Sequence, residues 1–344
     1  MKNTAEPAPP GRRCCPLQGG WRPHEVGKPG GEPKAWWPWA RRVVVSGFLL
    51  FVAALLIFQA RAIEWREVFD AIGAYPSAVL LTAATLSAAS HLIYSSFDLV
   101  GRRYTGHALR APTVMGITFV SYAFNLNLGT LVGAVGMRAR LYSRLGLEAA
   151  TITRVVGTSM LTNWLGYFLL AGLAFLCWPL ALPADWHIGV GALQVLGGAL
   201  VAVALGYLAL CAFSRRREWT VAGHEIGLPG LRLAGIQLVI SIANWAVMGA
   251  IMDVLLQDKV GYPTALSVLL TGAVAGLLSR VPAGLGVLEG VFVALLAPPL
   301  SNTTLIAAVL MYRAVYYWAP LAVATLLYLA MEANARKLAA AAAA

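Results

Sequence analysis

Hydrophobic residues lie in long runs along this chain, and polar residues collect in the short segments between them. A helix needs about twenty consecutive, mainly apolar residues to cross the hydrocarbon core of a bilayer. Runs of that length predict an all-α, polytopic membrane protein with six uninterrupted transmembrane helices, at Val43–Ala60, Ala78–Gly101, Val155–Trp178, Ile188–Phe213, Leu233–Leu256 and Leu305–Ala330.

Two further apolar stretches, Pro112–Gly136 and Pro263–Leu300, are interrupted. Arginines flank the first stretch on both sides, whereas the loops beside the second stretch hold few basic residues. The arginines that flank the first stretch are Arg102, Arg103, Arg110, Arg138, Arg140, Arg144 and Arg154. Because basic residues concentrate in cytoplasmic loops, the first stretch is expected to enter and leave from the cytoplasmic face and the second from the opposite face. This arrangement has six full crossings, two re-entrant hairpins and both termini in the cytoplasm. A plain eight-span arrangement is the alternative.

The second interrupted stretch contains the sequence SRVPAGLGVLE at residues 279–289. Pro282 cannot donate a backbone hydrogen bond, and Gly284 and Gly286 loosen the chain. Gly129 marks a similar break in the first stretch. Broken backbone is tolerated at membrane depth only where it is buried in protein or lines a cavity. The sequence therefore predicts a polar site inside the protein.

The surroundings of the two interrupted stretches match, which predicts an internal repeat over about residues 78–178 and 233–330. The two units begin on opposite faces, so the repeat is inverted. Inverted repeats whose broken helices meet near the midplane are a transporter architecture, and the N-termini of half-helices suit an anionic headgroup. Chance similarity among segments built from the same few apolar residues is the alternative.

Composition supports the membrane assignment, because hydrophobic residues make up 59% of the 344 residues and charged residues only 12%. A disordered cytoplasmic tail is expected over residues 1–42, a single membrane domain over 43–335 and a short cytoplasmic tail over 336–344. The net charge of +11 comes largely from residues that flank the apolar runs, which argues against a nucleic-acid partner. The four cysteines show no CxxC or Cys/His spacing, so no metal site is expected.

The deepest charges in the predicted membrane domain are Arg280, Glu289 and Arg313. An unpaired charge at the centre of a membrane helix costs about 2.5–3.5 kcal/mol on insertion scales. Arg280 and Glu289 bracket the break and could pair, which would leave Arg313 to meet a phosphate through its guanidinium fork. The alternative is a buried ion pair that only holds the hairpin shut.

Further polar residues are candidates for ion transfer or for lining a lipid path. His91, Asp98 and Asp253 could act as an ion or proton relay, although packing or solvated roles are the favoured alternative for them. Arg138, Arg140 and Arg144 form a basic cluster expected at the cytoplasmic mouth of the first hairpin, where it would attract anionic lipid or serve only as a topology signal. Asn125 and Asn127 could line the site or join helices. No hydrolytic triad, GxxxxGK or HExxH motif is present, so neither an enzyme nor a cofactor is expected.

Two parts of the sequence carry a family resemblance. The first is Asn125–Gly129 together with MRARLYSRLG at residues 137–146, and the second is Arg280–Glu289. They resemble the YbhN family of bacterial inner-membrane proteins, which is similar to the flippase-like membrane region of lysylphosphatidylglycerol synthase. The resemblance implies lipid movement across the inner membrane and a lipid-binding cavity near the hairpins. The positions it touches are Asn125, Gly129, Arg138, Arg140, Arg280, Pro282, Gly284, Gly286 and Glu289. The sequence has Pro-Ala-Gly at residues 282–284, where the synthases more often show Pro-Gly-Gly.

The expected function is movement of an anionic phospholipid or related amphiphile between the leaflets of the bacterial inner membrane, by a flippase- or scramblase-like transporter. Membrane lipids are the expected partners, with a lipid-synthesis enzyme or a second copy of the chain as further partners. The alternatives are a non-catalytic membrane partner of a lipid-synthesis enzyme and, less favoured, an integral-membrane enzyme that modifies lipids.

Overall fold

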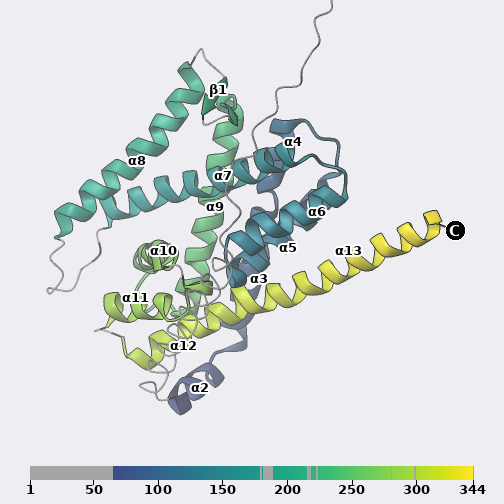
Figure 1. The fold of residues 1–344 in the computed structure, drawn as a ribbon. Helices are drawn as coiled ribbons and strands as arrows, with labels where there is room; N and C mark the ends of the chain where they lie inside the picture. The colour runs from purple at the N-terminus through teal and green to yellow at the C-terminus, as the bar shows by residue number, and fades with distance from the viewer. Residues whose placement is uncertain are drawn as a thin grey trace, which may run out of the picture. The chain divides into compact units, whose positions relative to one another are not determined.

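The computed structural model describes residues 65–178, 180, 189–214, 218–221, 224–279, 281–297 and 300–343. The expected disordered tail, the predicted span Val43–Ala60 and Arg280 lie outside these residues. The described part is built of helices and one short antiparallel β-hairpin, as Figure 1 shows. The all-α prediction is therefore confirmed, with the hairpin as a small addition.

The elements follow one another in three groups along the described chain. The first group contains α2 (Trp65–Gly73), α3 (Ser77–Ser95), α4 (Phe97–Thr105), α5 (Ala111–Leu128), the π-helical segment η1 (Leu131–Met137), α6 (Arg138–Arg144) and α7 (Ala149–Cys177). The second contains α8 (Val190–Phe213), β1 (Glu218–Val221), β2 (His224–Gly227) and α9 (Leu231–Leu255). The third contains α10 (Tyr262–Ser279), the 3₁₀ turn η2 (Pro282–Gly284), α11 (Val287–Leu296), α12 (Asn302–Arg313), the π-helical segment η3 (Ala314–Trp318) and α13 (Ala319–Ala343).

Six helical stretches within the described residues are long and apolar enough to cross a membrane. They are Ser77–Thr105, Ala149–Cys177, Val190–Phe213, Leu231–Leu255, Tyr262–Ser279 and Asn302–Ala333. Five of them coincide with predicted spans, and the sixth is α10, which belongs to the second interrupted stretch. Helix α7 begins at Ala149, before the predicted start at Val155, so Arg154 lies inside the helix. These lengths and compositions support a multi-pass membrane protein.

Helix α8 shows what surrounds the protein. Its described buried residues are Gly197, Ala204 and Cys211, which recur every seven residues and form one narrow stripe. Elsewhere the helix exposes large apolar side chains, including Val195 at 74% and Phe213 at 85% exposure. A helix that is apolar all round is stable when hydrocarbon or protein covers every side. The exposed faces of α8 therefore fit contact with lipid.

The first interrupted stretch folds as a helical hairpin. The φ angle of Gly129 is +84°, a conformation that favours glycine, and its N–H donates to the Asn125 carbonyl over 2.9 Å. Segment η1 then packs back along α5. A Cβ atom added to Gly133 would lie 2.0 Å from the Asn125 backbone nitrogen. Glycine at position 133 thus lets the two arms touch backbone to backbone.

The second interrupted stretch also folds back, as α11 packs against α10. Between them the chain has positive φ angles at Ala283 (+56°), Gly284 (+56°) and Gly286 (+77°), so the break predicted from SRVPAGLGVLE is confirmed. A Cβ added to Gly284 would lie 3.7 Å from the Cα of Gly276 on α10, which is ordinary van der Waals contact. The two hairpins meet, because α5 contacts both η2 and η3. Entry and exit through one membrane face, and the inverted repeat, stay predictions.

We expect Gly133→Ala to destabilise the protein by about 1–3 kcal/mol, the usual cost of overpacking, because the new methyl group would overlap the Asn125 backbone. Gly116→Ala on α5 is the matched control: nothing lies within 4 Å of its added Cβ, and alanine favours the helix by up to ~1 kcal/mol. Thermal unfolding of the purified protein in detergent measures both. A Gly133→Ala variant as stable as the wild type would contradict the backbone contact.

Single cysteines at Ser143 and Asn302, both exposed positions, test the crossing pattern. The re-entrant arrangement puts three full spans between them and hence opposite membrane faces, whereas the eight-span arrangement puts them on the same face. With the natural cysteines replaced by serine, a membrane-impermeant maleimide should label Asn302→Cys from outside. Ser143→Cys should be labelled only after permeabilisation. Labelling of both from one side would rule out the re-entrant arrangement.

Candidate functional site

Two arginines are buried in the apolar interior, and each is only 1% exposed. Arg138 is the first residue of α6, directly after η1, and Arg313 is the last residue of α12, directly before η3. A π-helical segment frequently marks a functional site in a helix. Each arginine therefore occupies a junction between regular helix and a wider, distorted turn.

Arg138 binds a carboxylate from α4. Its Nε donates to Asp98 Oδ2 over 2.9 Å and its Nη2 to Asp98 Oδ1 over 3.1 Å, which is the two-pronged geometry that guanidinium and carboxylate favour. Its other contacts are the Ala134 carbonyl in η1 at 3.2 Å and Ser159 Oγ at 3.3 Å. The Tyr142 hydroxyl donates to Asp98 Oδ2 over 2.9 Å. This set of residues, termed the first clamp, ties the first hairpin to α4 and α7.

Arg313 binds the second hairpin in a similar way. Its Nε donates to Glu289 Oε1 over 2.6 Å and its Nη2 to Glu289 Oε2 over 3.1 Å. Nη1 donates to the Ala283 carbonyl and Nη2 to the Gly284 carbonyl, both over 2.8 Å. The guanidinium carbon lies 5.5 Å from the centre of the Tyr317 ring. This set of contacts is termed the second clamp. Through it, Arg313 at the end of α12 fixes the break between α10 and α11.

The clamps correct the expected pairing of the arginines. Arg280, which by its position in the sequence could pair with Glu289, lies outside the described residues. The described partner of Glu289 is Arg313. Arg138 does not belong to a surface cluster, because it is buried against Asp98. Arg140 and Arg144 are about half exposed, and both pair with Glu332 on α13. The expected basic cluster is therefore divided between a buried clamp and a surface contact.

The candidate relay residues make separate contacts in the described structure. His91 Nδ1 lies 2.9 Å from the Ser87 carbonyl, whereas its buried Nε2 has no protein partner among the described residues. Asp98 belongs to the first clamp, and Asp253 lies near the end of α9. No described hydrogen bond or ion pair joins these three side chains, and their relay role stays a prediction.

A buried polar network lies beside His91, whose ring is 4.7 Å from that of Tyr316 between centres. The Ser90 hydroxyl donates to Asn244 Oδ1 over 2.8 Å and lies 2.8 Å from the Tyr316 hydroxyl. The Tyr316 hydroxyl also lies 3.0 Å from that of Tyr122. The network joins α3, α5, α9 and η3, so the two halves of the described chain share a polar centre.

The remaining candidate residues lie at the hairpin tips. Asn127 Nδ2 donates to the Ala123 carbonyl over 2.9 Å and to the Tyr317 carbonyl over 3.2 Å, so it links the first hairpin to the segment after the second clamp. Asn125 and Gly129 form the first turn, and Gly284 and Gly286 with Pro282 of η2 form the second. Whether these residues contact a lipid stays a prediction.

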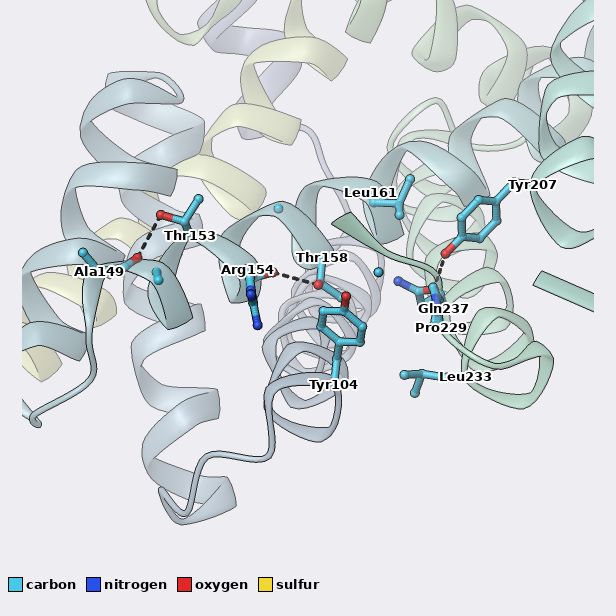
Figure 2. Close-up of a pocket in the computed structure, with 13 residues that line it drawn as sticks. Tyr104, Ala149, Thr153, Arg154, Thr158, Leu161, Tyr207, Pro229, Leu233 and Gln237 are labelled. Atoms are coloured by element: carbon cyan, nitrogen blue, oxygen red, sulfur yellow. Dashed lines mark hydrogen bonds between the residues drawn. The ribbon is translucent and has the colours of Figure 1, made fainter. Parts of the chain in front are cut away.

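A cavity of about 780 Å³ lies beside the first half of α7, and Figure 2 shows its lining. Its polar lining residues come from four helices and are Tyr104, Thr153, Arg154, Thr158, Tyr207 and Gln237. The Tyr207 hydroxyl donates to Gln237 Oε1 over 3.0 Å, and Gln237 Nε2 donates to Thr162 Oγ1 over 2.9 Å. In the sequence, Arg154 is only a charge that flanks an apolar run, because helical register and neighbours are needed to place it in a cavity.

A second cavity of about 560 Å³ lies farther along α7, against α8 and α10. Its lining is almost wholly apolar and consists of Trp164, Tyr167, Phe168, Phe175, Leu193, Leu196, Leu200, Thr271, Val274 and Leu277. The sequence does not predict such a cavity, because an apolar run has the same pattern whether its side chains pack against a neighbouring helix or line a cavity.

Among the described residues, two titratable groups in the segments between helices have shifted pKa values. Burial raises the pKa of Tyr75 to about 12, and its hydroxyl donates to the Leu255 carbonyl over 2.7 Å. Burial, with the nearby Arg102 guanidinium, lowers the pKa of His107, just beyond α4. A lowered pKa keeps His107 neutral at pH 7, so it adds no charge at that end of the helix.

Removing one member of the first clamp leaves a buried, unpaired charge. We expect Arg138→Met and Asp98→Leu each to cost about 3–5 kcal/mol, and the double variant to recover most of that loss because no charge remains. Arg140→Gln on the same helix is the control, since an exposed arginine contributes about 0–1 kcal/mol. Thermal unfolding in detergent measures the cycle. Purely additive losses in the double variant would show that the two side chains do not stabilise each other.

Comparison with known proteins adds a family to this geometry. The sequence matches the family described as "Lysylphosphatidylglycerol synthase TM region" over residues 42–324, a range that contains both hairpins and both clamps. It is 45% identical over 303 residues to "Inner membrane protein YbhN" of Escherichia coli (strain K12), covering 88% of this chain and 95% of that protein. It is 28% identical over 265 residues to "Uncharacterized protein slr0712" of Synechocystis sp. (strain ATCC 27184 / PCC 6803 / Kazusa), covering 76% and 82%. On these matches, the chain belongs to the family of the lysylphosphatidylglycerol synthase transmembrane region.

Proposed function

We propose that this protein moves an anionic phospholipid, or a related anionic amphiphile, between the two leaflets of the bacterial inner membrane. Membership of a family named after the membrane region of a lipid synthase supports a lipid-related role, and a relative named as an inner-membrane protein supports the location. In the topology that we propose, both termini are cytoplasmic, as the distribution of arginines indicates.

The observation that carries the proposal is the broken helix clamped inside an apolar body. At the second break the carbonyls of Ala283 and Gly284 turn away from regular helix and accept from Arg313. Unsatisfied backbone at membrane depth costs several kcal/mol, so such breaks are found where they serve a polar path or cavity. Discontinuous helices that meet inside the membrane are a recurrent feature of transporters.

The clamps give the arginines a different role from the one expected. The Arg313 guanidinium already donates to Glu289 and two backbone carbonyls, and Arg138 donates to Asp98, Ala134 and Ser159. We therefore assign both arginines as positioning residues that fix the breaks, in place of the headgroup contact expected for Arg313. The hairpin residues Asn125, Gly129, Gly284 and Gly286 remain the proposed neighbours of a passing headgroup.

A transbilayer assay with labelled phosphatidylglycerol tests the proposal. An impermeant quencher added to unilamellar vesicles reaches only the labelled lipid in the outer leaflet. In protein-free vesicles it should quench that fraction alone, whereas in vesicles with the wild-type protein it should quench a larger fraction, because labelled lipid moves outward. Arg313→Lys keeps the charge but loses the two-pronged geometry, so we expect transport at least about tenfold slower, the factor that about 1.4 kcal/mol produces. The exposed Arg140→Gln should resemble the wild type.

Three results of this assay are informative. Identical quenching in wild-type and protein-free vesicles would refute transport and favour a non-transporting partner of a lipid-synthesis enzyme. Equal rates for Arg313→Lys and Arg140→Gln would refute the positioning role alone. A chemically altered lipid recovered from the vesicles would point instead to a lipid-modifying enzyme.

A further inference from the structure

One face of α7 lines both cavities. The residues Ala150, Arg154, Gly157, Leu161, Trp164, Phe168 and Phe175 all line one or the other. Their spacing of three and four residues, with one gap of seven, keeps them within a narrow stripe on a helix of 3.6 residues per turn. The stripe carries the charged Arg154 near its beginning and aromatic side chains from Trp164 to its end.

The packing of α7 and α8 explains why space remains along this stripe. A Cβ on Gly172 would lie 2.8 Å from the Gly197 carbonyl oxygen, and a Cβ on Gly197 would lie 2.8 Å from that of Gly172. The helices therefore cross in close contact near the end of α7. They diverge toward its beginning, as Figure 1 shows, and the larger cavity lies at that end.

The two cavities differ in the chemistry of their walls. Arg154 is the one charged side chain among the described residues that line the larger cavity, and hydroxyl and amide groups surround it. A guanidinium suits a phosphate oxygen, and the Tyr104 hydroxyl lies in the same lining. The Thr158 hydroxyl donates to the Arg154 carbonyl over 2.7 Å. The smaller cavity is aromatic and aliphatic, which suits an acyl chain.

The separation of the cavities matches the dimensions of one lipid. Arg154 and Phe168 are 14 residues apart on one helix, which corresponds to about 21 Å at 1.5 Å per residue. Half of a hydrocarbon core is about 15 Å thick, and the headgroup lies beyond it. A lipid with its phosphate at Arg154 would thus place its chains beside Trp164 and Phe168.

Resting on the proposed function, we infer that this stripe of α7 is the seat of one anionic phospholipid of the cytoplasmic leaflet. Its phosphate is bound by Arg154 with Tyr104, and an acyl chain fills the cavity between α7, α8 and α10. No residue assigned to the seat belongs to either clamp, so we assign it as a loading site for substrate and not as the place where the lipid crosses.

Lipid retention by the purified protein, counted by native mass spectrometry, tests the seat. Wild-type protein should retain phosphatidylglycerol at least about tenfold more tightly than phosphatidylcholine, which is about 1.4 kcal/mol. Arg154→Gln should abolish this preference and Arg154→Lys should keep part of it. Arg103→Gln, an exposed arginine on α4 outside the lining, is the matched control.

A second pair of variants tests the apolar cavity. Leu200→Trp should fill it and reduce retention of both lipids, whereas Val203→Trp, at a position 56% exposed on the same helix, should not. An excess of free glycerol phosphate should fail to displace phosphatidylglycerol, because it has no acyl chain. Thermal unfolding of each variant separates lost binding from lost folding.

Equal retention of phosphatidylglycerol and phosphatidylcholine by the wild-type protein would refute the seat. So would an Arg154→Gln variant whose preference for phosphatidylglycerol equals that of Arg103→Gln. Displacement by glycerol phosphate would replace a lipid seat with a soluble-phosphate site. Specific retention without transbilayer movement would refute the proposed function and leave the seat standing. If Arg154→Gln changes neither transbilayer movement nor lipid retention, the seat is refuted and the proposed function is not.

Discussion

The described structure depends on pairing each buried guanidinium with a carboxylate from another helix. An isolated charge inside an apolar protein costs several kcal/mol, so neither Arg138 nor Arg313 could remain where it is without Asp98 or Glu289. The pairing fixes more than the charges. Ala134, Ala283 and Gly284 contribute carbonyls from the hairpins themselves, so burial of each arginine also sets the shape of the adjoining break.

The second break shows how such a contact can hold an unfavourable backbone in place. Ala283 has a φ of +56°, a left-handed conformation that costs a residue with a Cβ about 1–2 kcal/mol. Its carbonyl accepts from Arg313 over 2.8 Å, a charge-assisted bond of comparable size. Glycine would take this conformation without strain, so position 283 is one where alanine costs more than glycine.

The sequence was enough to predict five spans that the structure describes and the second break. Both follow from local chemistry: apolar length for a helix, and Pro with closely spaced Gly for its interruption. It was not enough to pair the charges. Glu289 is nearer in sequence to Arg280, yet its described partner is Arg313, 24 residues away along the chain. Nor did it place Arg154, since the apolar run begins at Val155 while helix α7 begins at Ala149. Partners and cavities depend on how helices cross, and close contacts such as Gly172 with Gly197 determine that crossing.

The two clamps also constrain how a lipid could pass. Both hairpins are held, and they touch through α5 and η2. On the proposed function, a headgroup that reaches the buried polar centre would therefore have to move a clamped hairpin. Breaking a buried pair costs about 3–5 kcal/mol when nothing replaces the lost partner, and the minor states that drive conformational change lie a few kcal/mol above the ground state. We therefore expect only one clamp to open at a time, so that the other keeps the hairpins in place.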